Sequence, residues 1–98
     1  MNEKGSVSWL VVELELPGCK SLKEKRAKLQ PLLLRLRREF NVSAAEIGML
    51  DLRDTSRVAF SIVSNDGQYN QQVLNHLVIF IEDHFPEMEI LQYRIEDR

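Results

Sequence analysis

The first half of the sequence places a strand pattern next to a helix pattern. From Val7 to Leu16, apolar residues stand at every second position, which is typical of a strand that buries one face. The residues predicted to face the core are Leu10, Val12, Leu14 and Leu16. Pro17 and Gly18 then end the strand and begin a short turn. The turn is short, so the next element should fold back over the strand.

That next element is a predicted helix from Ser21 to Phe40. Ser21 and Glu24 form a capping box, in which each side chain accepts a hydrogen bond from the other residue's backbone. The apolar stripe, spaced three and four residues apart, consists of Leu22, Leu29, Leu32, Leu33, Leu36 and Phe40. Pro31 removes one backbone hydrogen bond, but the stripe keeps its phase across it. We therefore expect one helix, kinked near Pro31, that ends at Asn41 in the left-handed conformation.

The middle of the sequence predicts a hairpin and then a second helix. Residues 42–50 and 58–63 have strand patterns, and the short polar link between them predicts an antiparallel hairpin. A helix capped by Asn65 or Asp66 should run to about His84. Its predicted buried stripe comprises Tyr69, Val73, Leu77, Phe80 and Ile81, widened by Leu74 and Val78.

A last strand is predicted over residues 87–96, with Leu91, Tyr93 and Ile95 facing the core. The complete order gives the class α+β and predicts a ferredoxin-like βαββαβ sandwich. Two helices should cover one face of a four-stranded antiparallel sheet in the order 4-1-3-2, with right-handed crossovers. One domain should span residues 1–98, with residues 1–6 flexible, because the chain shows no linker or repeat.

The sheet face without helices, called the open face below, should display several apolar side chains. An exposed apolar surface of this kind usually has a partner. The residues expected in such an interface are Trp9, Val11, Val63 and Ile90. A homodimer through this face is the favoured explanation. An RNA platform would need paired aromatic side chains, and Glu13 and Glu15 beside Trp9 would repel phosphate.

Positive charge is concentrated in the first predicted helix. The net charge of the chain is −2, yet residues 20–39 hold eight basic and two acidic residues, and the rest is acidic. The basic residues are Lys20, Lys23, Lys25, Arg26, Lys28, Arg35, Arg37 and Arg38. From charge alone, a solvated helix face that pairs with acidic neighbours is the favoured explanation. The alternative is a patch that binds a polyanion such as RNA, with these side chains as the nucleic-acid contacts.

Catalytic and metal-binding motifs are absent from the sequence, which has no CxxC, HExxH, GxSxG or glycine-rich phosphate loop. His76 and His84 are too far apart along their helix to share a metal, and Cys19 is expected to be structural. We therefore predict a non-enzymatic protein without a cofactor or a metal. The sequence has no apolar run of the ~20 residues that a membrane span needs, and it has no signal-peptide pattern. This predicts a cytoplasmic protein that does not enter a membrane.

The segment around the first helix carries a family resemblance. PGCKSLKEKR at residues 17–26, with FNVSAAE at 40–46 and VSND at 63–66, resembles the YlxP-like family, known as domain of unknown function 503. The resemblance covers almost the whole chain, although Pro31 departs from the helix-forming residues usual there. It implies a ferredoxin-like fold and no established catalytic residues. Genes of this family often lie beside those of translation and ribosome-maturation factors, so the resemblance also implies a role near rRNA or the ribosome.

Two hypotheses for the function follow. In the first, a small non-enzymatic protein binds RNA or the ribosome through its basic first helix, whose side chains contact phosphates without reading base sequence. In the second, the protein is a homodimeric scaffold or a ligand-binding module that uses the open face. The two hypotheses are compatible, because a dimer would present two basic helices.

Overall fold

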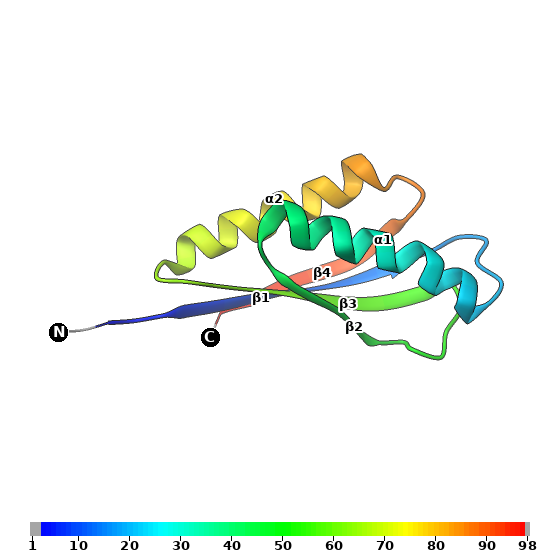
Figure 1. Ribbon diagram of the computed structural model, residues 1–98, viewed down its shortest axis with the longest axis horizontal. Coiled ribbons are helices and arrows are strands. Elements are labelled where there is room, and N and C mark those ends of the chain that lie inside the picture. The colour runs from blue at the N-terminus through cyan, green and yellow to red at the C-terminus, as the bar shows by residue number, and fades with distance from the viewer. Residues whose placement is uncertain (1–2, 98) are drawn as a thin grey trace.

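The computed structural model describes residues 3–97 (Figure 1). Over these residues, the strands and helices follow the predicted order. The elements are β1 (Ser6–Glu15), α1 (Leu22–Phe40), β2 (Ser43–Gly48), β3 (Thr55–Ser64), α2 (Gly67–His84) and β4 (Glu89–Asp97). Of the segment 1–6 expected to be flexible, Met1 and Asn2 lie outside the described residues. Ser6, the last residue of this segment, begins β1 and pairs with Ser64 in the sheet.

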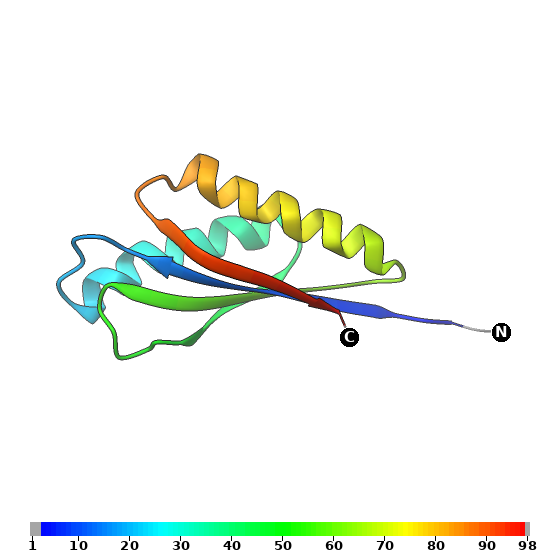
Figure 2. The same ribbon diagram turned by 180° about the vertical axis from the view of Figure 1, so that it is seen from behind.

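The four strands form one antiparallel sheet in the order β2-β3-β1-β4, which is the predicted 4-1-3-2 order read from the other edge. Both helices lie on the same side of the sheet, and within residues 3–97 no helix covers the opposite side (Figures 1 and 2). The predicted ferredoxin-like sandwich is therefore confirmed. The arrangement leaves the outer surface of α1 and the open face of the sheet as two separate surfaces.

Local hydrogen bonds set the ends of the two helices. The Ser21 side chain accepts from the Glu24 backbone N–H at 3.1 Å, as the capping box predicts. The Glu24 carboxylate, however, accepts from the N–H of Lys20, one residue earlier than predicted. Asn41 ends α1 with φ of 47°, the expected left-handed conformation. Asp66 is the N-cap of α2, and α1 continues through Pro31 as one helix.

The hydrophobic core lies between the sheet and the helices. Its buried residues from β1 are the predicted even-numbered ones, together with Leu16 just beyond the strand. The stripe of α2 is rotated from its predicted position, since Tyr69 is exposed and Asn70 is fully buried. Asn70 is accepted in the core because its amide donates to the Ser6 carbonyl at 3.2 Å and its oxygen accepts from the Ser64 hydroxyl at 2.6 Å. The stripe is therefore centred on Leu74, Leu77, Val78 and Ile81.

A bulge in β4 reverses the predicted direction of one interface residue. Glu13 is opposite Gln92, but the next residue of β1, Leu14, is opposite Ile90, so Leu91 is an extra residue in β4. An inserted residue shifts the alternation of the strand by one position. Ile90 consequently packs against the core on the helix-covered face, and its predicted place in an open-face interface is wrong. Leu91, predicted to face the core, is 48% exposed.

Candidate nucleic-acid interface

The buried leucines of α1 determine which way its basic residues point. Leu29, Leu32 and Leu36 are buried against the sheet, so the positions on the other sides of the helix face outwards. All but one of the predicted nucleic-acid contacts accordingly lie at the surface. The exposed or half-exposed ones are Lys20, Lys23, Arg26, Lys28, Arg35, Arg37 and Arg38. The leucine stripe thus builds the fold and at the same time presents the positive charge.

Lys25 is the exception, and its predicted role as a phosphate contact is wrong. It lies four residues before Leu29 on the buried stripe, and its side chain is 1% exposed. Its Nζ lies 2.9 Å from the carboxylate of Glu46 and donates to the carbonyl oxygens of Met49 and Thr55 at 2.9 and 3.0 Å. An ammonium group has three N–H donors, so these three acceptors satisfy it completely.

These contacts of Lys25, called the Lys25 network below, hold α1 against β2 and against the loop that follows β2. The hydroxyl of Ser56 donates to the same carboxylate of Glu46 at 2.7 Å, which completes the network from the side of β3. Sequence reasoning missed this cluster, although one signal was present. Lys25 occupies a stripe position where an apolar residue is expected, and a buried ammonium needs an anionic partner. Identifying Glu46 as that partner required the position of β2.

One flank of exposed basic residues faces the β2 edge of the sheet. Arg37 donates from Nη1 to the carbonyl oxygen of Ala44 in β2 at 3.1 Å, which fixes the direction of this flank. Arg26 and Lys23 precede Arg37 by 11 and 14 residues. These spacings are close to whole turns of a helix with ~3.6 residues per turn, so all three side chains share the flank.

The opposite flank of α1 faces α2. The guanidinium carbon of Arg35 lies 5.2 Å from the centre of the Phe80 ring, close enough for a cation–π contact, and its Nε lies 3.1 Å from Glu39. Lys28 lies about two turns before Arg35 and shares this flank. Arg38 is on the outer surface between the flanks, since it follows the buried Leu29 by about two and a half turns. Basic side chains therefore lie on both flanks of α1 and on the outer surface between them.

Ion pairs separate the basic residues into two groups. Among residues 3–97, the ion pairs of this segment join Lys25 to Glu46 and Arg35 to Glu39. The basic residues of the segment that form no ion pair within this range are Lys20, Lys23, Arg26, Lys28, Arg37 and Arg38. Pairing with acidic neighbours, the explanation favoured by charge alone, therefore applies to only a small part of the basic segment.

The open face is apolar towards one end of the strands. A shallow hollow of about 220 Å³ lies over β1, β3 and β2. It is lined by Trp9, Ser43, Ala44, Ala45, Ile47, Ala59, Phe60 and Ser61. Of the predicted interface residues, Trp9 is half-buried and its indole N–H donates to Glu96, and Val63 is 70% exposed. Val11 is buried even though no helix covers it.

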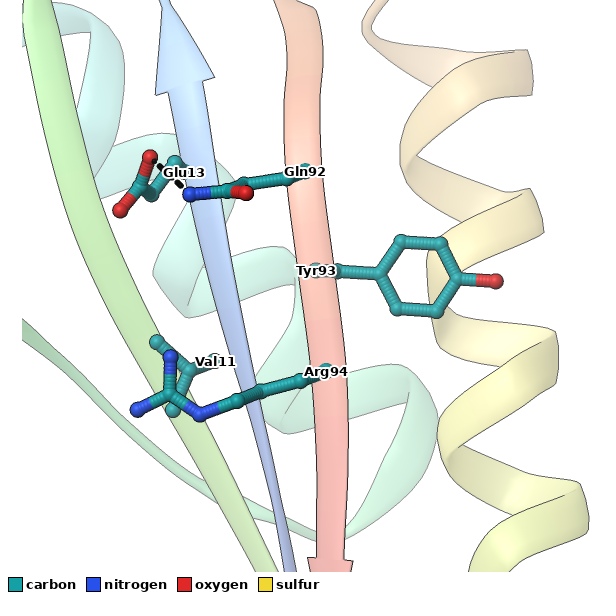
Figure 3. A pocket seen from close by; sticks show the side chains of 5 residues that line it. All are labelled: Val11, Glu13, Gln92, Tyr93 and Arg94. Atoms are coloured by element: carbon teal, nitrogen blue, oxygen red, sulfur yellow. Dashed lines mark hydrogen bonds between the residues drawn. The ribbon is translucent and has the colours of Figure 1, made fainter.

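The other end of the open face carries a network of hydrogen-bonded polar side chains around Glu13. Its Oε1 accepts from Nη2 of Arg57 at 2.8 Å, and its Oε2 accepts from Nε2 of Gln92 at 2.8 Å. The hydrogen bonds from Arg57 and Gln92 hold the pKa of Glu13 below its ordinary value of 4.5, and the charges of Arg57 and Arg94 act in the same direction against the effect of burial. Figure 3 shows Gln92 and Arg94 extending from β4 across β1, whereas Tyr93 points away towards α2.

The hollow among these side chains measures about 80 Å³, the scale of a few water molecules, whereas sites for small-molecule ligands measure ~300 Å³ or more.

A further hollow of about 230 Å³ is lined by residues of both helices: Phe40, His76, Ile79, Phe80, Asp83 and His84. There the Phe80 ring stacks on His84 at 3.9 Å and meets Phe40 edge-on at 5.4 Å. Both histidines are exposed on α2.

Within residues 3–97, no group of three or more His, Cys, Asp or Glu side chains is placed to hold a metal ion. No helix in the same range has the length and apolar character to cross a membrane. Cys19 is buried in the core, in agreement with its expected structural role.

Similarity to solved structures concerns the fold of the chain alone. The de novo designed protein Foldit4 has the same fold, with a TM-score of 0.55, 12% identity and coverage of 97% of both chains. A dabb family protein with a ferredoxin-like fold from Mesorhizobium loti gives a TM-score of 0.49 at 18% identity, over 97% of this chain and 96% of that one.

The sequence comparisons identify the family. The chain is 41% identical over 69 residues to the uncharacterized protein YlxP of Bacillus subtilis (strain 168), which covers 70% of this chain and 74% of that protein. The sequence profile of the family described as "Protein of unknown function (DUF503)" matches residues 7–95. The resemblance found around SLKEKR is therefore confirmed, and the chain belongs to the DUF503 family of proteins of unknown function.

Proposed function

We propose that this protein is a non-enzymatic RNA-binding protein that associates with ribosomal RNA through the outer side of α1. The observation that carries the proposal is the set of surface basic side chains on and before α1 without an ion-pair partner among residues 3–97. Arginine and lysine side chains of this kind bind phosphate oxygens, and arginine does so with two parallel hydrogen bonds. Binding of the phosphate backbone requires no catalytic group.

The length of the basic surface suits a nucleic-acid backbone. Lys23 and Arg38 are 15 residues apart on one helix. At a rise of ~1.5 Å per residue, they span roughly 22 Å along the helix axis. Phosphates of one strand of a DNA duplex are spaced ~3.4 Å along its axis, so a surface of this length can lie along several successive phosphates of a nucleic-acid strand. Contacts of this type supply affinity and salt dependence but little sequence specificity.

The rest of the surface favours a single docking orientation. The chain outside residues 20–39 has an excess of acidic residues, and those near the end of α2 and the start of β4 are exposed. These are Glu82, Asp83, Glu87 and Glu89. They repel phosphate, so long-range electrostatic attraction would turn α1 towards the RNA. The choice of ribosomal RNA as the target rests on the position of this family's genes beside those of ribosome-maturation factors.

The test compares charge reversals at matched exposed sites. Arg26→Glu and the double variant Lys23→Glu/Arg26→Glu change the β2-side flank of α1, whereas Lys4→Glu changes an exposed residue before β1. Binding to a short fluorescent RNA hairpin is measured by anisotropy over a range of salt concentrations, and association with ribosomes is measured by co-sedimentation. Each lost phosphate contact should lower the slope of log K against log salt by about 1.

The expected result is weaker binding and a smaller salt slope for the α1 variants, with Lys4→Glu close to the native protein. Circular dichroism should show an unchanged fold for all of them, because the altered side chains are exposed. Equal binding by the native protein and the double variant would contradict the proposal. An equal loss in Lys4→Glu would show that net charge, rather than α1, determines binding.

A further inference from the structure

The two central strands of the open face pair complementary side chains. β1 and β3 are antiparallel neighbours, and their open-face residues stand directly opposite each other. The three central pairs, with the β1 residue first, are Trp9 with Ser61, Val11 with Ala59, and Glu13 with Arg57. The first two pairs place a larger side chain beside a smaller one, and the third places a carboxylate beside a guanidinium. Each open-face residue of β1 therefore has a complementary neighbour in β3, and the same complementarity could serve contacts with another molecule.

We propose that the open face binds a second copy of this chain, in a dimer whose two-fold axis runs parallel to the strands, between β1 and β3. Such an axis lays β1 of each copy over β3 of the other, at the same level along the strands. Each residue then meets, across the interface, the residue that stands opposite it within its own chain. The Trp9–Ser61 and Glu13–Arg57 pairs of the sheet become complementary contacts between the two copies, around the already buried Val11 and Ala59.

The apolar end of the face fits this arrangement. The hollow of about 220 Å³ includes Ser61, Ala59 and Ala45, whose short side chains leave the space open. The axis places Trp9 of each copy over Ser61 of the other, and therefore over this hollow. Large side chains that fill small-residue hollows are the contacts that usually dominate binding, and tryptophan is enriched among them. Val63, which is 70% exposed in the single chain, becomes covered at the same end.

In this dimer, the charged end of the open face is also complementary to the charged end of the second copy. Within one chain, Arg57 bonds to Glu13 through Nε and Nη2 at 3.2 and 2.8 Å. In the dimer, Arg57 of each copy lies over Glu13 of the other, so that the four side chains alternate in sign around the axis. A face that carried one sign of charge would repel its copy, whereas alternating charges favour association in this register. The same carboxylates disfavour RNA on this face.

The area of the face is on the scale of a stable interface. β1 and β3 are each 10 residues long and lie at the centre of the four strands. With ~4.8 Å between strands and ~3.3 Å per residue, the face measures roughly 500 Å² in projection. Side chains make its accessible area larger than the projection. Standard-size interfaces bury ~800 Å² per partner, and paired sheets that pack face to face cross at about 30°, which keeps the central pairs in register.

The test measures the mass of the native chain and of two matched variants. Light scattering coupled to size exclusion should give twice the mass of one chain for the native protein. Ser61→Arg fills the hollow on the open face, whereas Ile79→Arg introduces the same side chain at an exposed position on α2. Ser61→Arg should give the mass of one chain, and Ile79→Arg should keep the native mass. Val63→Glu, at a more exposed position of the same face, replaces Ser61→Arg if that variant does not fold.

A charge exchange tests the register of the two copies. Arg57→Glu places like charges together both within one chain and across the interface, and it should weaken dimerisation tenfold or more, as expected for like charges brought together in an interface. The double variant Glu13→Arg/Arg57→Glu should recover part of the lost affinity, because the contacts between positions 13 and 57 regain opposite signs while Arg94 keeps its charge. A native chain that remains a monomer overturns the proposal. So does a dimer that survives Ser61→Arg and Val63→Glu, or one that is broken by Ile79→Arg.

Discussion

Two ion pairs of similar length lie on opposite sides of the same sheet. On the helix-covered side, Lys25 meets Glu46 at 2.9 Å with side chains that are 1% and 18% exposed. On the open face, Arg57 meets Glu13 at 2.8 Å with side chains that are 38% and 15% exposed. The first cation is enclosed under α1 by carbonyl oxygens as well, whereas the second still reaches water.

The difference shows that burial, rather than distance, decides what such a pair does. A buried pair that loses one partner leaves an uncompensated charge in a poorly solvated place, so it is costly to break. A pair that water can reach has little effect on stability but remains available for contacts with another molecule. We therefore assign the Lys25 pair to the fold and the Arg57 pair to the proposed dimer interface.

The largest expected effect comes from breaking the buried pair. Lys25→Met removes the ammonium, so the Glu46 carboxylate loses its cation and the carbonyl oxygens of Met49 and Thr55 each lose one donor. The free energy of unfolding should fall by roughly 3–5 kcal/mol, as is usual when one partner of a buried pair is removed. Urea denaturation followed by circular dichroism measures this change. The matched control is Arg26→Met, one residue later at an exposed position, which should change stability by less than about 0.5 kcal/mol. Similar changes in the free energy of unfolding for the two variants would show that Lys25 does not stabilise the packing of α1 on the sheet as we describe.

A smaller effect is expected at the buried amide under α2. Asn70→Ala removes the hydrogen bond to the Ser6 carbonyl oxygen and the hydrogen bond from the Ser64 hydroxyl, and it should cost about 1–3 kcal/mol. Asn75→Ala on the same helix is the control, because the side chain of Asn75 is exposed and donates to the carbonyl oxygen of Gln71 in the preceding turn. Hydrogen exchange at the start of β1 should become faster in the first variant only. An unchanged exchange rate there would mean that Asn70 does not hold β1 in place.

The smallest effect is expected from the exposed pair, and it should depend on pH. The folded chain lowers the pKa of Glu13 below 4.5, chiefly through the hydrogen bond from Arg57. A carboxyl group with a lowered folded pKa contributes stability that is complete above its unfolded pKa and is lost as the pH falls through the folded pKa. The Glu13 contribution should therefore disappear on acidification below pH 4.5.

Titration of the Glu13 side chain by NMR checks this expectation. Arg57→Gln should return the pKa towards 4.5, because it weakens the largest of the causes, whereas Arg94→Gln should raise it less, because Arg94 acts only through its charge. A larger effect of Arg94→Gln would contradict the assignment of Arg57 as the main partner. The same titration in dilute and concentrated samples would also report on the proposed dimer, since a second copy brings Arg57 close to Glu13 again.

The sequence by itself determined the order of strands and helices, the fold class and the outward direction of most basic residues of α1. Each of these follows from local periodicity, capping residues and short connections, which act over a few neighbouring positions. The leucine stripe is enough to predict that Lys23, Arg26 and Arg38 lie at the surface. The family could also be recognised from contiguous motifs.

Only the tertiary structure decided that Lys25 and Asn70 are buried and that Ile90 faces the core. Lys25 and Asn70 are buried because partners from distant segments satisfy their polar atoms, and those partners are not neighbours in the sequence. Ile90 faces the core because a bulge at Leu91 shifts the alternation of β4, and the register of a strand is set by the strand beside it. Pairing across the sheet also placed Glu13 beside Arg57 and Trp9 beside Ser61, since contacts between strands depend on three-dimensional register rather than on sequence order.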